Sequence, residues 1–163
     1  SGGVNMLFAK LRAQAGYSVA RKLFNQRWAV ENPRVWQWMQ ERFARMSSYD
    51  DVSARAFYGH VLLHRGQGFA AKNEGLRLLR LAAEAGDAKS AYQLGLQALT
   101  GTLNEPANAL QAAHWWELAG RAGHPLALQR LLALYEQGGA QLVASAEDAE
   151  RIRRQLALEQ GLA

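Results

Sequence analysis

Apolar residues recur along this chain at the three- and four-residue spacing of an amphipathic α-helix. The segment 33–47 is a clear case, since a 3-4-3 spacing puts its large apolar residues on one face: Trp36, Met39, Phe43 and Met46. Asn32 and Pro33 favour a helix start there, because Asn caps free amides and Pro is tolerated at the first helical position. With further helices predicted at about 6–14 and 17–30, residues 1–50 are expected to be all helical.

From residue 51 onward the pattern repeats itself. The segment 78–86, LLRLAAEAG, returns as 115–123, WWELAGRAG, at a shift of 37 residues. Upstream, the spacing that begins at Ala56 recurs 35 residues later at Ala91 and 37 residues after that at Leu128. A period of this size predicts stacked helical hairpins, because one hairpin cannot bury its apolar face alone. We expect three hairpins, followed by a tail at 159–163; their ranges are 51–87, 88–124 and 125–158.

Glycines and small residues support this arrangement. Gly86 and Gly123 are suited to end helices, because glycine adopts the left-handed C-cap conformation without steric cost. A small residue at Gly95 allows two helices to approach closely, while Trp115 is expected to be buried between the second and third hairpins. Ser145 starts a weak capping box, so a helix at 146–158 is predicted to close the stack.

The second hairpin resembles the Sel1-like repeat (SLR) family, a relative of the tetratricopeptide repeats. The family pattern A-x2-LG-x2-Y-x2-G is matched by Ala91 to Gly95 with Gly101, and W-Y-x2-A-A-x2-G by Trp115 to Gly123. The match covers about residues 51–140, although the first unit lacks the Leu-Gly pair and the third lacks the small residue. The resemblance implies an all-α fold, a short α/α superhelix of three hairpins with extra N-terminal helices. It also implies an adaptor role without catalysis.

In such a superhelix the first helix of each hairpin lines a concave groove. Carrying tetratricopeptide geometry onto this chain predicts the residues that face it: Phe57, Val61, His64, Lys89, Tyr92, Leu96, Leu99, Gln129, Ala133 and Glu136. An apolar floor with aromatic residues suits a peptide or a helix of another protein. In so short an array, the alternative is that the terminal helices fold over this surface.

The net charge of +5 is unevenly distributed. Residues 1–50 carry eight Lys or Arg against three Asp or Glu, whereas residues 51–163 carry eleven of each. No acidic residue precedes Glu31. The alternative function is therefore binding of nucleic acid or an anionic surface through the basic N-terminal third.

Two features of this third could carry such binding. Trp38 lies among Arg34, Arg42 and Arg45 on the face opposite the apolar stripe. It either packs on the preceding helix, anchors an acidic partner, or stacks on single-stranded nucleic acid. Beside Lys10 and Arg12, a short apolar group could also form a membrane-surface helix: Leu7, Phe8 and Leu11.

Nothing in the sequence indicates catalysis. The chain has no cysteine, which excludes disulfides and thiolate zinc sites. His60 and His64 have metal-binding spacing, but Val61 replaces the glutamate of H-E-x-x-H and no third ligand is near. The glycines at 66 and 68 lack the rest of a phosphate-binding motif, and no G-x-S-x-G occurs. We therefore expect no metal, no cofactor and no enzymatic activity.

The remaining expectations concern the protein class. The sequence has no membrane-spanning apolar run and no secretory signal, so we expect a soluble cytoplasmic protein, with a monomer as the default. Ser1-Gly2-Gly3 ahead of Met6 resembles a vector remnant over residues 1–5. Fifteen arginines against four lysines are typical of a GC-rich bacterial genome. The leading hypothesis is a helical-repeat adaptor that binds a protein or peptide segment in its groove.

Overall fold

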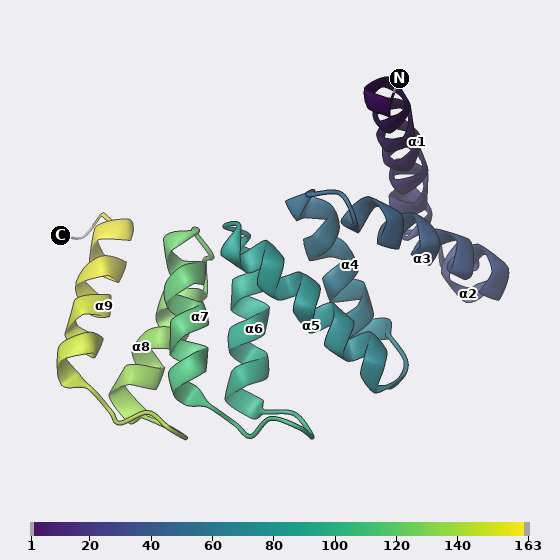
Figure 1. The fold of residues 1–163 in the computed structure, drawn as a ribbon. Coiled ribbons are helices and arrows are strands. Elements are labelled where there is room, and N and C mark those ends of the chain that lie inside the picture. Colours follow the sequence, from purple (N-terminus) through teal and green to yellow (C-terminus); the bar gives the residue numbers. More distant parts are fainter. Residues whose placement is uncertain (1, 162–163) are drawn as a thin grey trace. The chain divides into compact units, whose positions relative to one another are not determined.

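The computed structural model describes residues 2–161, and within that range the regular elements are nine α-helices (Figure 1). This confirms the predicted all-α fold. Residue 1 of the predicted vector remnant and residues 162–163 of the predicted tail lie outside the described residues. The helices are α1 (Gly2–Leu23), α2 (Arg27–Glu31), α3 (Pro33–Ser47), α4 (Val52–Arg65), α5 (Gly68–Glu84), α6 (Ala88–Thr100), α7 (Ala109–Arg121), α8 (Ala127–Gln137) and α9 (Ala146–Glu159).

The chain forms two compact units, which we call the N-terminal unit (Ser1–Gly75) and the C-terminal unit (Leu76–Ala163). The boundary falls inside α5, so this helix contributes to both units. The pairs α4 with α5, α6 with α7 and α8 with α9 correspond to the three predicted hairpins, with α9 extending one residue past 158. The division of the chain into repeats stays a prediction.

The N-terminal unit is built around α3, which packs against α1, α2 and α4. The predicted stripe of α3 forms its core, since Met39 and Phe43 are fully buried and Met46 is nearly so. Aromatic rings meet around Phe43 in edge-to-face geometry, an arrangement that contributes about 0.5–1.5 kcal/mol per pair beyond area burial. The rings of the cluster come from several helices and from the turn after α1: Tyr17, Phe24, Trp36, Phe43 and Phe57.

The prediction of two separate helices at 6–14 and 17–30 is wrong. One continuous helix, α1, runs through Gly16 and ends at Leu23. Gly16 does not end the helix, because it lies in the face that packs on α3. A methyl group added there would lie 3.0 Å from Cδ of Arg42. The small residue therefore serves close approach between helices rather than a turn.

In the C-terminal unit, helices α6 to α9 follow one another, each running back along the previous one (Figure 1). The predicted repeat is visible in the backbone hydrogen bonds. The amide of Asn108 donates to the carbonyl of Ala98 at 2.8 Å, and 37 residues later Ser145 donates to Tyr135, also at 2.8 Å. The sequence period of 37 residues is thus a structural period in this unit.

Helix ends follow the glycine prediction. Gly86 and Gly123 have φ angles of 102° and 90°, in the region that glycine occupies without strain. The amide after each glycine bonds back to the helix: Asp87 to Ala82 at 3.0 Å and His124 to Ala119 at 2.9 Å. Gly86 and Gly123 therefore end α5 and α7 as predicted.

The prediction for Trp115 is wrong in its packing partner. Trp115 is buried, but it lies with Leu94 and Arg80, on the side of the preceding helices α5 and α6. The adjacent Trp116 belongs instead to the core that includes Leu128 and Leu131 of α8. Its indole NH donates to the carbonyl of Tyr92 at 3.1 Å, and its ring fills the space above Gly95. The contact between Gly95 of α6 and Trp116 of α7 agrees with the prediction that a small residue at position 95 allows two helices to approach closely.

Candidate protein-binding site

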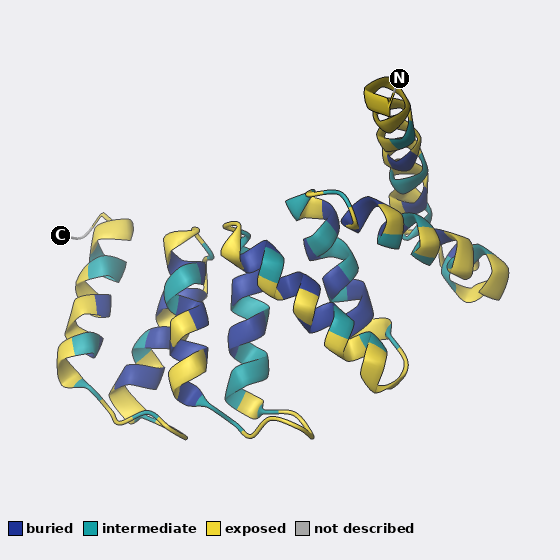
Figure 2. Ribbon diagram, in the orientation of Figure 1, coloured by how far each residue is buried: buried dark blue, intermediate teal, exposed yellow. Residues whose placement is uncertain are grey.

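The predicted groove residues of α6 lie between the surface and the core. Lys89 is exposed, whereas Tyr92, Leu96 and Leu99 are half-buried and pack against the core of the C-terminal unit. The Tyr92 ring stacks on His124 with 4.0 Å between centroids. Burial lowers the pKa of His124, which favours a neutral imidazole in this stack. Figure 2 shows α6 as mostly buried or half-buried along its length.

The predicted groove residues of α8 are more open. Gln129, Ala133 and Glu136 are all exposed. Glu136 lies 3.8 Å from a guanidinium nitrogen of Arg153, so its carboxylate is turned toward α9. Leu96 and Leu99 of α6 pack against a core to which α8 contributes. We call this set the α6/α8 surface: Lys89, Tyr92, Leu96, Leu99, Gln129, Ala133 and Glu136.

The groove residues predicted for the first repeat lie in the N-terminal unit, and two of them are not open. Phe57 packs in the aromatic core with its centroid 5.0 Å from that of Phe43, and Val61 is buried. The physical reason at Phe57 is that α3 packs against α4 and uses this ring as core. His64 is exposed. Phe57 and Val61 therefore do not provide the open surface that tetratricopeptide geometry predicted for them.

A polar network that the sequence analysis missed connects three helices of the C-terminal unit. Glu117 of α7 accepts a hydrogen bond from the Tyr135 hydroxyl of α8 at 2.8 Å. The same carboxylate oxygen lies 2.6 Å from Nη2 of Arg151 in α9. Arg151 also reaches Asp148 at 3.4 Å. Tyr135 and Arg151 are 18 and 34 positions from Glu117 in the sequence, so no local pattern predicts these contacts.

The network shifts the titration of its members. Burial works to raise the pKa of Glu117, but the hydrogen bonds from Arg151 and Tyr135 outweigh it and lower this pKa. Burial and the hydrogen bond to Glu117 raise the pKa of Tyr135 to about 12. The carboxylate is therefore held charged and the hydroxyl neutral over the physiological range. This arrangement is suited to holding helices together, because its groups are already occupied by each other.

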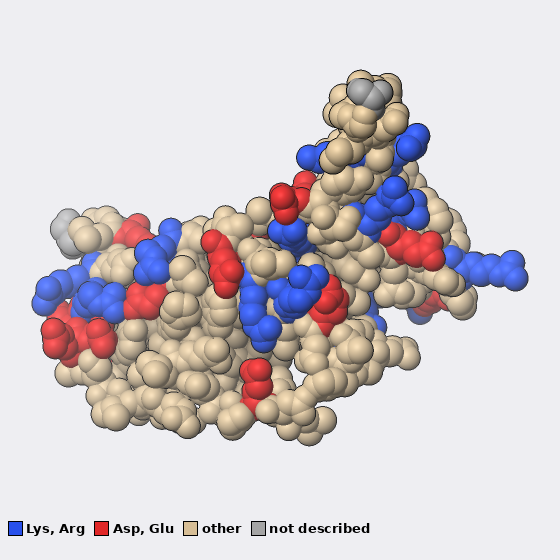
Figure 3. Space-filling view, in the orientation of Figure 1, with Lys and Arg blue, Asp and Glu red and all other residues tan. Residues whose placement is uncertain are grey.

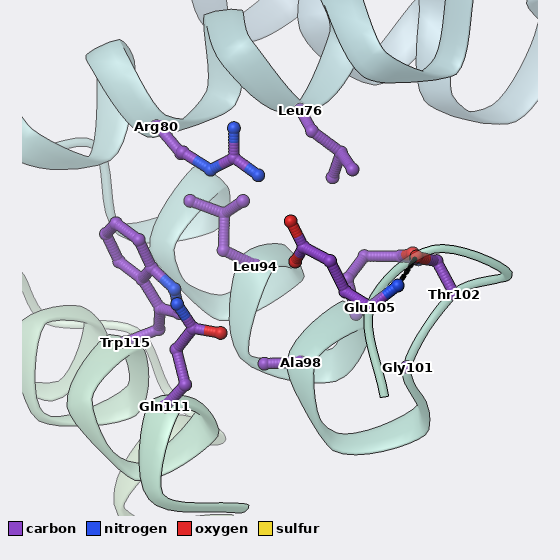
Figure 4. Close-up of a pocket in the computed structure, with 10 residues that line it drawn as sticks. Leu76, Arg80, Leu94, Ala98, Gly101, Thr102, Glu105, Gln111 and Trp115 are labelled. Atoms are coloured by element: carbon purple, nitrogen blue, oxygen red, sulfur yellow. Dashed lines mark hydrogen bonds between the residues drawn. The ribbon is translucent and has the colours of Figure 1, made fainter. Parts of the chain in front are cut away.

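A small pocket of the C-terminal unit lies between α5, α6, α7 and the loop 101–108 (Figure 4). Arg80, Glu105 and Gln111 provide its polar groups, and Leu94 and Trp115 its apolar wall. The backbone amide of Glu105 donates to the Thr102 hydroxyl at 3.1 Å, which fixes the loop. The pocket holds about 30 Å³, room for one or two water molecules. This is far below the size that small-molecule sites require.

The predicted basic patch lies on α3 in the N-terminal unit. Arg34 and Arg45 are exposed, and Trp38 is 38% exposed. The guanidinium of Arg42 lies 5.8 Å from the centre of the Trp38 ring, while its stem covers Gly16 of α1. Trp36, rather than Trp38, packs with the aromatic core. The indole of Trp38 is thus partly available to solvent, with one arginine already beside it.

The histidine pair in α4 has no third candidate metal ligand beside it in the described part of the chain. The His60 and His64 rings are stacked with 6.3 Å between centroids, and Nδ1 of His60 lies 2.7 Å from the carbonyl oxygen of Ala56. Among residues 2–161, no three histidine or carboxylate side chains come together as a ligand set. Over the same residues, no helix is both long enough and apolar enough to cross a membrane.

Chains similar to this one among the solved structures include two helical-repeat proteins. A Sel1 repeat protein from Oxalobacter formigenes is 26% identical with a TM-score of 0.58, and the match covers 73% of this chain and 88% of that chain. The protein c5321, a protective antigen of uropathogenic Escherichia coli strains displaying an SLR fold, is 22% identical with a TM-score of 0.61. That match covers 76% of this chain and 26% of the antigen. Neither the family models nor the curated proteins match the sequence.

Proposed function

This chain belongs to the Sel1-like repeat family, whose members are built of helical repeats and typically serve as protein-interaction scaffolds. We propose that it binds a segment of another protein on the α6/α8 surface. It acts as an adaptor, and neither a cofactor nor catalysis is part of its action. The observation that supports this proposal is the composition of the surface. Leu96 and Leu99 are half-buried and apolar, and Lys89, Gln129 and Glu136 of the same set are exposed and polar, a combination that suits the apolar face of a peptide or helix.

The size of the pocket in the C-terminal unit supports a macromolecular partner. A volume of about 30 Å³ cannot enclose a substrate, and its polar groups lack the arrangement of a nucleophile with its base. An extended surface does not need a cavity, because a peptide gains affinity from a few anchors spread along it. This pocket therefore gives no reason to expect a metabolite, and the proposed partner is a protein segment.

Selection from a displayed library of random peptides tests the proposal. We expect the wild-type protein to enrich related peptides, and the double variant Lys89→Glu with Gln129→Glu to bind them at least about tenfold more weakly. Both side chains are exposed, so the variant is expected to keep its melting temperature. Tyr92→Ala is a poorer probe, because the ring stacks on His124 and its loss would disturb packing.

A matched control is available on α7. His114 and Arg121 are also exposed, and His114→Glu with Arg121→Glu introduces the same two carboxylates away from the α6/α8 surface. The control should bind the selected peptides like wild type. If no related peptides are enriched, or if both double variants bind them equally well, the α6/α8 surface is not the binding site.

A further inference from the structure

Helix α1 has two apolar faces, and only one of them is covered. On the covered face, Ala13, Gly16 and Ala20 lie where α1 packs on α3, and the two alanines are buried. On the other face, four large apolar side chains are half exposed: Leu7 57%, Phe8 55%, Leu11 49% and Val19 50%. Single exposed apolar residues are ordinary, but a contiguous row of them marks an interaction surface.

These residues form one stripe along the helix. With Ala15, which is also exposed, Phe8, Leu11 and Val19 are separated by three or four positions, and Leu7 lies beside them. At about 100° per residue this spacing keeps them on one side of α1. Figure 2 shows the N-terminal half of α1 as largely exposed, and Figure 1 shows it extending beyond α3. We call this row the α1 stripe.

Positive charge borders the α1 stripe on both sides. On the helical projection Arg12 lies along one edge and Lys10 along the other. No acidic residue occurs in residues 1–30. Figure 3 shows α1 as a tan surface with blue side chains at its margins.

From this arrangement we propose that the α1 stripe docks on an anionic lipid surface, with its apolar side chains inserted at the level of the headgroups. An apolar helix face bordered by Lys and Arg is the pattern of interfacial helices, where the cations contact lipid phosphates and the apolar side chains leave water. The helix lies on the membrane and does not cross it, in agreement with the absence of a spanning helix among residues 2–161.

The charges argue against a second copy of this chain as the occupant. If two α1 stripes met, Lys10 and Arg12 of each copy would line the same interface, and neither α1 helix carries an acidic residue. Like charges brought together at an interface are unfavourable. An anionic surface satisfies the same cations. The inference concerns the N-terminal unit and does not depend on peptide binding by the α6/α8 surface.

Cosedimentation with vesicles tests this inference. We expect the wild-type protein to bind vesicles of equal amounts of phosphatidylcholine and phosphatidylglycerol, and to bind phosphatidylcholine vesicles at least about tenfold more weakly. The variant Phe8→Ser with Leu11→Ser should lose at least about tenfold in partitioning to the anionic vesicles, because two apolar side chains no longer leave water. Lys10→Glu with Arg12→Glu should lose a similar factor.

Val143→Ser with Leu158→Ser is the matched control, since it removes two exposed apolar side chains of the C-terminal unit and should leave vesicle binding unchanged. Circular dichroism should show the same melting temperature for all variants, as the altered side chains are exposed. Absence of vesicle binding overturns the proposal, and so does binding that the serine variant retains in full. A dimer that the serine variant converts to a monomer, without vesicle binding, assigns the α1 stripe to a second copy instead.

Discussion

In the two units, backbone carbonyl groups at equivalent positions of the repeat accept hydrogen bonds from different kinds of donor. In the C-terminal unit, the carbonyls of Ala98 and Tyr135, near the ends of α6 and α8, accept hydrogen bonds from backbone amides at 2.8 Å. In the N-terminal unit the repeat-equivalent carbonyl is that of Leu63, near the end of α4. It accepts from the side-chain amine of Lys72 at 3.0 Å.

This difference separates the short connection after α4 from the longer loops after α6 and α8. A loop held by backbone bonds needs only the right length and a glycine at its start, and Gly101 and Gly138 have φ angles of 77° and 70°. Its other side chains are free to differ, as Glu105 and Leu142 do at equivalent positions. The shorter α4–α5 connection relies on a particular side chain. Such a solution leaves no periodic signal in the sequence.

The cores differ in the same sense. In the C-terminal unit, the large side chain of Trp116 packs against Gly95, which has no side chain. The N-terminal unit fills its core with aromatic rings, and Arg21 lies 3.9 Å above the Phe57 ring as a cation–π partner. The Gly95–Trp116 pair belongs to the second hairpin, because Leu132 stands at the equivalent position of the third, and the aromatic cluster is likewise particular to its place. Periodicity in this chain therefore follows backbone geometry rather than overall hydrophobicity.

The largest expected effect tests the core of the C-terminal unit. Trp116→Ala should lower the free energy of unfolding by about 3–5 kcal/mol, because a fully buried aromatic side chain is removed. Trp28→Ala in the N-terminal unit is the control and should change it by no more than about 0.5 kcal/mol, since Trp28 is exposed. Denaturant unfolding followed by circular dichroism measures both. Equal losses in the two variants would contradict the packing described for Trp116.

A pair of glycine substitutions sharpens the comparison between units. Gly95→Ala should destabilise the protein by about 1–3 kcal/mol, because the new methyl group overlaps the Trp116 indole. Gly16→Ala should be neutral or stabilising by up to about 1 kcal/mol, since only the flexible stem of Arg42 must move and alanine favours helix. Thermal and denaturant unfolding of both variants give the measurement. A neutral Gly95→Ala would show that the two helices are not in close contact there.

The polar network predicts a smaller, pH-dependent effect. Glu117→Gln should destabilise the protein by about 1–2 kcal/mol at neutral pH, because the charged hydrogen bonds to Arg151 and Tyr135 are weakened. The folded pKa of Glu117 lies below its ordinary value of 4.5. Its contribution is therefore present above about pH 4.5 and is lost as the pH falls through the lowered pKa.

Melting temperatures of wild type and Glu117→Gln across this pH range check the sign. The difference between them should be constant at neutral pH and should shrink as the solution becomes more acidic than pH 4.5. Tyr135→Phe is the control, because it removes one hydrogen bond and keeps the carboxylate. A difference that grows toward acid would mean that Glu117 is not stabilised as an anion.

The smallest expected effect tests the carbonyl comparison itself. Lys72→Met should cost about 1 kcal/mol, because the carbonyl of Leu63 loses its donor while the side chain keeps its length. Glu105→Leu, which copies the residue at the equivalent position in the next loop, should stay within about 0.5 kcal/mol. Denaturant unfolding of the two variants decides it. A larger loss for Glu105→Leu would show that the long loops also depend on their side chains.

Some of the fold and little of the site followed from local residues. The 37-residue shift predicted helices, Gly86 and Gly123 predicted where two of them end, and the stripe of α3 predicted its buried face. The structure agrees with these predictions. The helix division around Gly16 was wrong, because one glycine allows a turn and close packing equally well. Phe57 was placed by repeat geometry, but its real neighbours come from helices outside the repeats.

What the sequence determined by itself is the secondary structure and the repeat, because helix propensity, capping and period act over a few residues or along a fixed spacing. Only the tertiary structure decided that Trp116 rather than Trp115 packs with α8, and that Glu117, Tyr135 and Arg151 meet. Adjacent tryptophans have the same propensity, so their order is settled by which face of α7 meets its neighbours. Partners separated by 18 and 34 residues come together only when three helices pack, which no local pattern encodes.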